Sequence, residues 1–266
     1  MSTPVKKIVW IASYPKSGNT WVRFMACNLL YGPQESAAAL NTLAPDIHEM
    51  GAAVNGPAPA SLLKTHFGFS AQLPYADQTA AAIYVVRDPA DVLVSNFFYS
   101  QRSGPQFDAS PDAFNRYVDA FVEHRGDPRW IERGMGSWED NVRSWLTSPR
   151  PFPVLKLRYE DMAADPETAC RGLAEILRPD SSDADVRQAV QSSSFQRMRD
   201  IERADIRNKR TGIFYKPYLQ PSIDAGSRFM RRGVVGDGPG RLSPDQRARL
   251  RSAFGSLLQE LDYSGI

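Results

Sequence analysis

Residues 8–21 read IVWIASYPKSGNTW, and this stretch decides the fold of the chain. The run IVWIAS (8–13) is short, continuous and apolar, which is typical of a strand buried on both faces of a sheet. After a turn that contains Lys16 and Gly18, residues 19–32 have the apolar spacing of a helix and end at a glycine followed by a proline. A strand, a glycine-containing turn and a helix in this order offer backbone N–H groups and the positive helix end to an anion.

The residues of this turn favour phosphate as the anion. Gly18 lets the backbone approach a ligand closely, Ser17, Asn19 and Thr20 add side-chain donors, and Lys16 adds a positive charge. A nucleotide-hydrolysing P-loop reads GxxxxGK[ST], with the lysine after the second glycine. Because Lys16 precedes the glycine here, the pattern indicates a P-loop-like turn of another kind. An ordinary βα turn whose lysine points into solvent is the alternative.

Three further segments predict buried strands: SLLKTH (61–66), AAIYVVRDP (81–89) and PVLKLRYEDM (153–162). Helical patterns opened by Pro89 and Pro166 follow two of them. Strands that alternate with helices predict an α/β fold, namely a three-layer, mostly parallel, doubly wound sheet with helices on both faces and a P-loop-like phosphate-binding loop after the first strand.

In a sheet of this kind, ligands bind beyond the carboxyl ends of the strands. The loop 14–20, His66 and Arg87 all come directly after predicted strands, so we expect them at one edge. Residues 33–60 are weakly patterned and are expected to pass over the surface.

The composition bounds the organisation of the chain and its partners. With 266 residues and 42% hydrophobic content, residues 1–266 are expected to form one domain, with residues 203–228 as a long, lid-like loop. A net charge of +2 argues against nucleic acid as a partner. The first apolar stretch is too short for a signal peptide and no run has transmembrane length, so we expect a cytoplasmic protein without a membrane partner. Cys27 and Cys170 read as reduced core residues.

Five separated motifs resemble those of the sulfotransferases that use 3′-phosphoadenosine-5′-phosphosulfate (PAPS). SYPKSGNTW (13–21) resembles the family's 5′-phosphosulfate loop, commonly TYPKSGTTW, and YVVRDPADVLVSNFFY (84–99) resembles its 3′-phosphate motif. FMRRGVVGDGPGRLS (229–243) resembles the late RKGxxGDW segment, which closes over the nucleotide. KTH (64–66) and YED (159–161) fall in the expected order. The resemblance spans almost the whole chain and implies a soluble, bacterial-type sulfotransferase.

Two more segments, GSWEDNVRSW (136–145) and SSFQRMRD (193–200), are similar to parts of the bacterial enzymes that sulfate glycopeptides. The resemblance implies PAPS as donor co-substrate, the bisphosphate PAP as product, and no metal. A sulfuryl donor already carries a good leaving group, and no acidic cluster of the sequence has the context of a magnesium site.

The resemblance also implies residue roles. Lys16 would contact the 5′-phosphate and the bridging oxygen, and Arg87 would bind the 3′-phosphate through its planar fork. The residues implied in nucleotide binding are Lys16, Ser17, Gly18, Asn19, Thr20, Trp21, Arg87, Ser95, Tyr159, Ser194, Phe195, Phe229, Met230, Arg231, Arg232 and Gly233. Among them, Trp21 would stack on adenine and the Tyr159 hydroxyl would reach its edge. By themselves, Arg87 and Asp88 could equally form an ion pair at a strand end.

His66 is the candidate general base, because an acceptor hydroxyl must lose a proton and imidazole titrates near neutral pH. Of three histidines, only this one ends a predicted buried strand. Lys64, two residues earlier, points to the same side of the strand and could stabilise sulfuryl oxygens, or could pair with Asp88 or Glu160. Lys16, Lys64 and His66 are therefore the predicted catalytic residues of an in-line transfer.

The acceptor is expected to be a hydroxyl group of a small molecule or natural product, first a glycopeptide and then a phenol or alcohol. The residues that could line an aromatic acceptor pocket are Phe97, Phe98, Tyr99, Phe107, Trp130 and 213–221. The sequence departs from the family where GDW is replaced by GDGPGRL (236–242). The lysine–threonine–valine–glutamate dimer motif is absent from 244–266, so a homodimer is possible but has no motif to support it.

Two other function classes remain open from the residues alone. A nucleotide kinase or NTPase would share the α/β fold, but its GK[ST] order is missing. A non-catalytic nucleotide-binding module would use the same loop and arginines, but it would leave the KTH segment (64–66) without a task.

Overall fold

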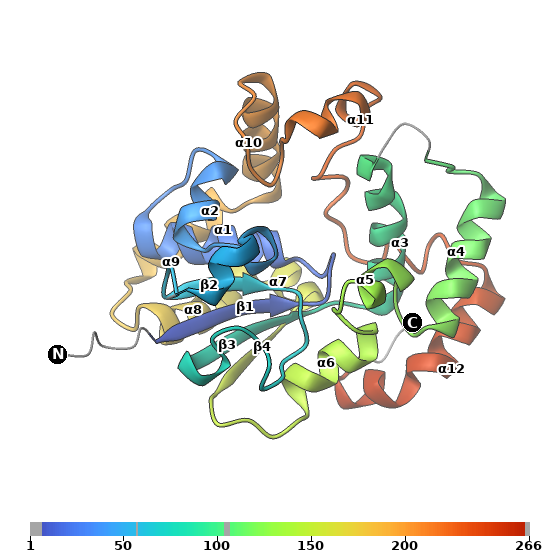
Figure 1. Cartoon of the computed structure of the whole chain (residues 1–266), viewed down its shortest axis with the longest axis horizontal. Helices are drawn as coiled ribbons and strands as arrows, with labels where there is room; N and C mark the ends of the chain where they lie inside the picture. The colour runs from blue at the N-terminus through green and yellow to red at the C-terminus, as the bar shows by residue number, and fades with distance from the viewer. Residues whose placement is uncertain (1–6, 57, 104–106, 264–266) are drawn as a thin grey trace.

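The sheet is four-stranded and parallel, with the strand carrying the opening motif near its centre. The computed structural model describes residues 7–56, 58–103 and 107–263. Its strands are β1 (Ile8–Ser13), β2 (Leu62–Thr65), β3 (Thr79–Val86) and β4 (Val154–Arg158), in the order β2-β1-β3-β4 (Figure 1). Ala12 lies opposite Thr65 of β2 and Tyr84 of β3, so the three strands end close together.

The helices surround this sheet on both faces (Figure 1). The α-helices of the described chain are α1 (Asn19–Tyr31), α2 (Leu40–Leu43), α3 (Pro89–Tyr99), α4 (Pro111–Glu123), α5 (Pro128–Glu132), α6 (Trp138–Leu146), α7 (Tyr159–Ala164), α8 (Pro166–Leu177), α9 (Asp183–Ser192), α10 (Phe195–Arg207), α11 (Gln220–Asp224) and α12 (Pro244–Glu260). Short 3₁₀ helices are η1 (Ala37–Ala39), η2 (Ile47–Glu49), η3 (Gly51–Asn55), η4 (Ala76–Gln78), η5 (Ser100–Ser103) and η6 (Pro217–Leu219).

Alternate residues of the central strands enter two separate cores. Trp10 and Tyr84 pack with buried side chains of α3, α4, α6 and α12. Ile11 and Val85 pack with α1, α8, α9 and α10 on the opposite face. A strand whose successive side chains point to opposite faces must bury both sets when helices cover both faces. The expected three-layer α/β fold is thereby confirmed.

Proline after a capping residue starts several of these helices. Asp88 accepts hydrogen bonds from the N–H groups of Ala90 and Asp91 ahead of α3, and Asp165 accepts one from Thr168 ahead of α8. Proline suits the first helical position because its missing N–H group would have no helical partner there. The predicted helix starts at Pro89 and Pro166 are confirmed.

Two sequence expectations about local structure were wrong, and a third segment, 33–60, has more regular structure than its weak pattern indicates. The fourth strand ends at Arg158, and the segment YED begins helix α7 instead of continuing the strand. Residues 203–228 are not one long loop, since the first of them complete α10 and others form η6 and α11. Residues 33–60 contain η1, α2, η2 and η3.

Arg23, which is distant in sequence, explains why residues 33–60 form regular structure. The buried Arg23 side chain of α1 donates hydrogen bonds to the carbonyl oxygens of Leu40 (3.1 Å) and Ala44 (2.7 Å), at the start and end of α2. Carbonyl groups at a helix end need partners from outside the helix. The local sequence of 33–60 does not contain that partner.

Both cysteines, Cys27 and Cys170, are free and buried, as expected of core residues. Within the described ranges, the structure has no helix with the length and apolar character needed to cross a membrane.

Candidate active site

A cavity of about 650 Å³ lies beyond the carboxyl ends of the strands and collects most of the predicted site residues. Those that line it are Lys16, Gly18, Asn19, Thr20, Trp21, Lys64, His66, Arg87, Ser95, Tyr159, Phe195, Phe229, Met230, Arg231, Arg232 and Gly233. We call the part formed by Lys16–Trp21, Arg87 and 229–237 the loop half. The part formed by Asp46–Glu49, Lys64, His66, Trp130 and 216–219 is the histidine half.

The turn after β1 has the backbone of an anion-binding loop. Lys16 and Gly18 both have positive φ angles, 72° and 110°. A Cβ atom at Gly18 would lie 2.7 Å from the Tyr159 ring, so this position has no room for a side chain. No side chain caps the N-terminus of α1. The Ser17 hydroxyl is buried and has no hydrogen-bond partner among the described residues. The free N–H groups of the first helical turn and this hydroxyl fit an anion.

The Asn19 side chain points back toward β1, whereas the sequence predicted that it faces the anion site. Its amide nitrogen donates hydrogen bonds to the Ile11 carbonyl (3.2 Å) and the Ser13 hydroxyl (3.3 Å), back toward β1. The side-chain donor predicted to face the ligand therefore holds the loop against its own strand.

The Lys16 ammonium group lies between two aromatic rings. Its Nζ atom is 3.9 Å from the centre of the Tyr99 ring and 4.4 Å from that of Phe229. Burial, and next the positive charges of Arg102 and Arg87, lower the lysine pKa to about 7. A lysine in this state gains stabilisation from any anion that enters the loop half.

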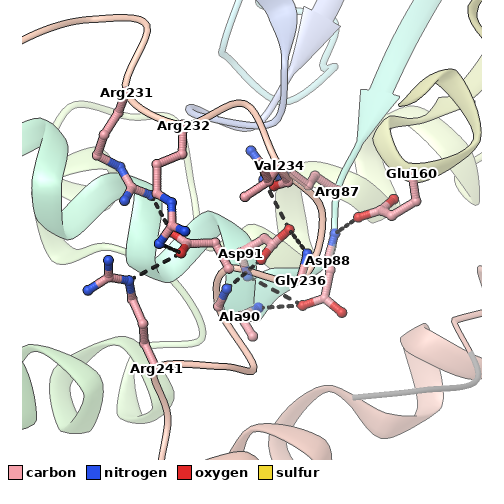
Figure 2. Close-up of polar contacts among 12 residues, drawn as sticks. Arg87, Asp88, Ala90, Asp91, Glu160, Arg231, Arg232, Val234, Gly236 and Arg241 are labelled. Carbon is pink, nitrogen blue, oxygen red and sulfur yellow. Dashed lines mark hydrogen bonds and ion pairs between the residues drawn. The ribbon is translucent and has the colours of Figure 1, made fainter. Parts of the chain in front are cut away.

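Arg87 is held at the end of β3 by a carboxylate one helical turn away. Its Nη2 atom donates to Asp91 Oδ2 at 3.0 Å and to the Val234 carbonyl at 2.8 Å, as Figure 2 shows. Its Nε is buried and has no partner among the described residues. The guanidinium lies 4.0 Å from the centre of the Tyr159 ring. The ion pair is thus with Asp91, and not with Asp88 as the sequence alternative had it.

Asp91 also attaches the segment after Gly233 to the start of α3. Its carboxylate accepts hydrogen bonds from the N–H groups of Gly236 (3.0 Å; Figure 2) and Gly238 (2.6 Å). One buried carboxylate therefore fixes both the arginine and the segment that covers it. In the expected family pattern a tryptophan stands where Gly238 makes this contact.

Asp237 forms ion pairs with three arginines, Arg231, Arg232 and Arg241, which are labelled in Figure 2. It pairs with Arg231 (2.6 Å), Arg232 (2.7 Å) and Arg241 (3.2 Å). Burial would raise the pKa of this carboxyl, but Arg231 and Arg241 hold it below its ordinary value. Arg231 and Arg232, both predicted to help bind the nucleotide, are therefore preorganised by a carboxylate that sequence reasoning missed.

The candidate adenine-binding residues are brought together, with one exception. The rings of Trp21 and Tyr159 meet edge to face at 5.6 Å between centres. Phe195 packs over Gly233, whose φ of 65° and lack of a Cβ allow that contact. Ser194 does not line the cavity, because its hydroxyl accepts a hydrogen bond from Arg197 N–H and caps α10.

Hydrogen bonds to its ring and to its main chain fix the orientation of His66. Its Nδ1 atom lies 2.7 Å from the Ser13 carbonyl, so Nδ1 carries the proton and Nε2 is left as the basic atom. Its carbonyl accepts a hydrogen bond from Asn141 Nδ2 (2.8 Å). Burial, then the Lys64 charge and His48, lower the imidazole pKa well below its ordinary value. The ring is therefore neutral and able to accept a proton at neutral pH.

Lys64 pairs with a carboxylate that the sequence did not single out. Its Nζ atom is 2.7 Å from Asp46 Oδ2, and both side chains are largely buried. Its partner is thus neither Asp88 nor Glu160; the Glu160 carboxylate accepts the Asp88 N–H and the Tyr263 hydroxyl instead. Burial lowers the lysine pKa to about 8, against the raising effect of Asp46.

The outer part of the histidine half joins segments that are far apart in sequence. Lys216 Nζ contacts Glu49 Oε1 at 2.7 Å, which connects η2 to the segment before η6. Tyr99 and Trp130 line the cavity, and Tyr218 lines it with 72% of its surface exposed. Of the predicted acceptor aromatics, Phe97, Phe98 and Phe107 are not among the lining residues. Phe97 packs against Phe98 and Phe107 instead.

Sequence reasoning missed the acidic residues that hold the site, namely Asp46, Asp91, Glu202 and Asp237. Asp91 could have been found from its position four residues after Arg87 on a helix start. Asp46 and Glu202 have no comparable local signal. In the described part of the chain, no group of three or more histidine, cysteine or acidic side chains is arranged to hold a metal ion.

Comparison with known proteins places this geometry in a family. The sulfotransferase domain model matches residues 6–262. Sulfotransferase 1A1 of the dog is 30% identical over 241 residues, which cover 85% of this chain and 75% of the relative. The amine sulfotransferase of the rabbit is 26% identical over 261 residues, covering 92% and 79%.

Solved structures show the same fold. Mouse sulfotransferase SULT7A1, solved with PAP, superposes with a TM-score of 0.69 at 22% identity, covering 98% of this chain and 90% of that one. Retinol dehydratase, solved with androsterone and PAP, gives a TM-score of 0.67 at 15% identity, covering 97% and 82%. As its motifs predicted, the chain belongs to the sulfotransferase family.

Proposed function

We propose that the chain transfers a sulfuryl group from PAPS to a hydroxyl group of a small-molecule or natural-product acceptor. The observation that carries this proposal is the pair of anion sites in the loop half. One is the turn at Lys16–Thr20, with an uncapped helix start and a buried, unpartnered Ser17 hydroxyl. The other is Arg87, directly after the neighbouring strand β3, together with Arg231 and Arg232 of the late segment.

A nucleotide with a phosphate at each end of its ribose fits this arrangement. We assign the inner, 5′-phosphate to the turn and Lys16, and the 3′-phosphate to Arg87, Ser95 and the segment that begins at Arg231. Arg87 keeps a buried Nε without a partner among the described residues, as expected of a group that awaits an anion. We assign the adenine to Trp21, Tyr159 and Phe195. PAPS supplies a sulfuryl group that already has a phosphate leaving group.

The chain's own residues then provide the proton transfer and the charge stabilisation. The acceptor O–H donates to His66 Nε2, which takes the proton as the oxygen bonds to sulfur. The S–O bond to the 5′-phosphate breaks, and Lys16 with the loop N–H groups stabilises the charge on that phosphate. Lys64, held by Asp46, lies two residues from His66 and adds positive charge near the sulfuryl oxygens.

The acceptor would enter through the histidine half. We propose glycopeptides first and phenols or alcohols second, with Tyr99, Trp130 and Tyr218 as contacts. We also propose that residues 203–228 act within the single domain as a cover over this entrance. Its Lys216 contact with Glu49 supports that arrangement.

The test is incubation of the purified protein with sulfur-labelled PAPS and a panel of phenols, alcohols, sugars and glycopeptides. We expect labelled product from wild type and a loss of roughly a thousandfold in turnover for His66→Ala. His124→Ala, at an exposed helix end, is the matched control. ATP with magnesium is the second donor: phosphate transfer or ATP hydrolysis without sulfuryl transfer would instead favour a kinase or NTPase. Binding of PAP without any transfer would favour a non-catalytic module.

A further inference from the structure

His66 lies one residue beyond the end of an edge strand. Strand β2 ends at Thr65, and β2 is the outermost strand of the order β2-β1-β3-β4. Successive N–H groups of a strand point to opposite edges, so those of residues 64 and 66 point the same way. The Lys64 N–H donates to the Pro45 carbonyl at 2.8 Å, away from β1. The His66 N–H therefore also faces the outer edge of β2, where the described residues supply no further strand.

A side chain fills the place of the missing strand. The His66 N–H donates to His48 Nε2 at 2.8 Å. His48 belongs to η2, which begins directly after Asp46, and its ring lies 4.3 Å from that of Phe67 between centres. We propose that His48 is a positioning residue for His66, its Nε2 replacing the backbone carbonyl that a neighbouring strand would have supplied.

The neighbouring Asp46 performs the matching task for Lys64. Asp46 forms an isolated parallel bridge with Lys64 and accepts its ammonium group through Oδ2. Its Oδ1 accepts the N–H group of His48, which fixes the start of η2. The four residues 45–48 thus hold the main chain and side chain of Lys64 and the main chain of His66. The segment PDIH acts as one support for the KTH motif.

The hydrogen bond sets the tautomer of His48. An imidazole nitrogen that accepts a backbone N–H cannot carry a proton, so His48 must be neutral with its proton on Nδ1. Burial, and next the Lys64 charge, lower the His48 pKa to about 4, which keeps the ring in this form at neutral pH. The groups that face His66 are Lys64, His48 and Asp46, together with the Ser13 carbonyl on β1 and the neutral Asn141 on α6.

The first test is independent of activity. The chain has three histidines, so ¹⁵N-histidine labelling gives a resolvable ring spectrum. We expect His48 and His66 both as Nδ1–H tautomers at pH 7, with the exposed His124 as the reference. A proton on His48 Nε2 would overturn the proposal, whether or not the protein transfers a sulfuryl group.

The second test rests on the proposed function, since it reads turnover. His48→Leu removes the acceptor, whereas His48→Gln places an oxygen at the same number of bonds from Cα. We expect His48→Leu to lower kcat roughly tenfold, with PAP affinity unchanged. We expect His48→Gln to keep a kcat close to that of wild type. Because His48 is among the groups that lower the His66 pKa, its loss should let this pKa rise toward its ordinary value, so the acid limb of kcat moves to higher pH.

Three results separate the possible failures. The positioning role of His48 would be overturned if His48→Leu kept the wild-type kcat and the wild-type acid limb of kcat. It would also be overturned if His48→Leu and His48→Gln lost equal amounts of kcat. If neither the wild type nor any variant transfers a sulfuryl group, the proposed function is rejected, and the tautomer test still decides the role of His48. If His48→Leu does not fold by circular dichroism, His48→Gln and the tautomer spectrum decide the matter.

Discussion

The two halves of the cavity are built in different ways. The loop half comes from a strand, a turn and a helix that follow one another within residues 8–31, with a strand-end arginine and a late basic segment added. The histidine half joins residues 46–49, 64–66, 130 and 216–219 through the ion pairs Asp46–Lys64 and Glu49–Lys216. Local motifs therefore form the proposed nucleotide site, whose geometry the backbone sets, whereas distant charge pairs shape the half that we propose faces the acceptor. Mutations should affect the two halves differently.

The strongest challenge to this comparison is Lys16→Met. We expect kcat to fall roughly a thousandfold, because the charge that develops on the departing phosphate loses its nearest cation. Affinity for PAP should fall less, since the loop N–H groups remain. Turnover and calorimetry measure the two effects, with Lys156→Met on the exposed side of β4 as control. A variant with wild-type kcat would remove Lys16 from the chemistry.

Asp91→Ala should have the next largest effect. It leaves the N–H groups of Gly236 and Gly238 and the Arg87 guanidinium without their shared acceptor. A buried donor without a partner costs about 1–3 kcal/mol, so PAP affinity should weaken roughly tenfold to a hundredfold. Isothermal calorimetry measures it. Asp91→Asn, which keeps one acceptor oxygen, should lose less, and Asp112→Ala on the exposed start of α4 should lose nothing. Unchanged affinity in Asp91→Ala would separate the segment 234–238 from nucleotide binding.

The Glu49–Lys216 pair tests the histidine half. Lys216→Glu places like charges across the acceptor entrance, and the partly exposed pair is worth little in free energy. We expect a change in acceptor KM of only a few fold, with the KM for PAPS unaffected. The double exchange, Glu49→Lys with Lys216→Glu, should restore the acceptor KM. An equal change in both KM values would show that the two halves are not independent.

The smallest expected effect is the number of protons that the protein takes up when it binds PAP. In the free protein the Lys16 pKa is lowered to about 7, so at pH 8 most of this lysine is neutral. A bound phosphate favours the ammonium form and raises the pKa toward its ordinary value. PAP binding at pH 8 should therefore take up a large fraction of one proton, and less as the pH falls below 7. Calorimetry in buffers of different ionisation enthalpy measures it. Lys16→Met should abolish the uptake, and its persistence there would assign it to another group.

The sequence alone determined the layers of the fold and the loop half. Continuous apolar strands, helix starts at Pro89 and Pro166, and the turn around Gly18 are local features whose physics acts over a few residues. The same locality explains the errors. Tyr159 continues an apolar strand pattern by sequence, but the structure starts a helix there. The single-domain organisation, oligomeric state and cytoplasmic location stay predictions from the sequence.

Only the tertiary structure decided which charges meet. Lys64 pairs with Asp46, Arg87 pairs with Asp91, and the His66 N–H donates to the His48 ring. The Lys64 and His66 contacts join residues 18 positions apart. Buried polar groups must find partners, and the chain meets that requirement with whichever side chains the packed sheet and its connections bring within reach. The residue types at 46, 48, 91 and 237 are visible in the sequence, but their tasks exist only once β2, α3 and the late segment lie at one edge of the sheet.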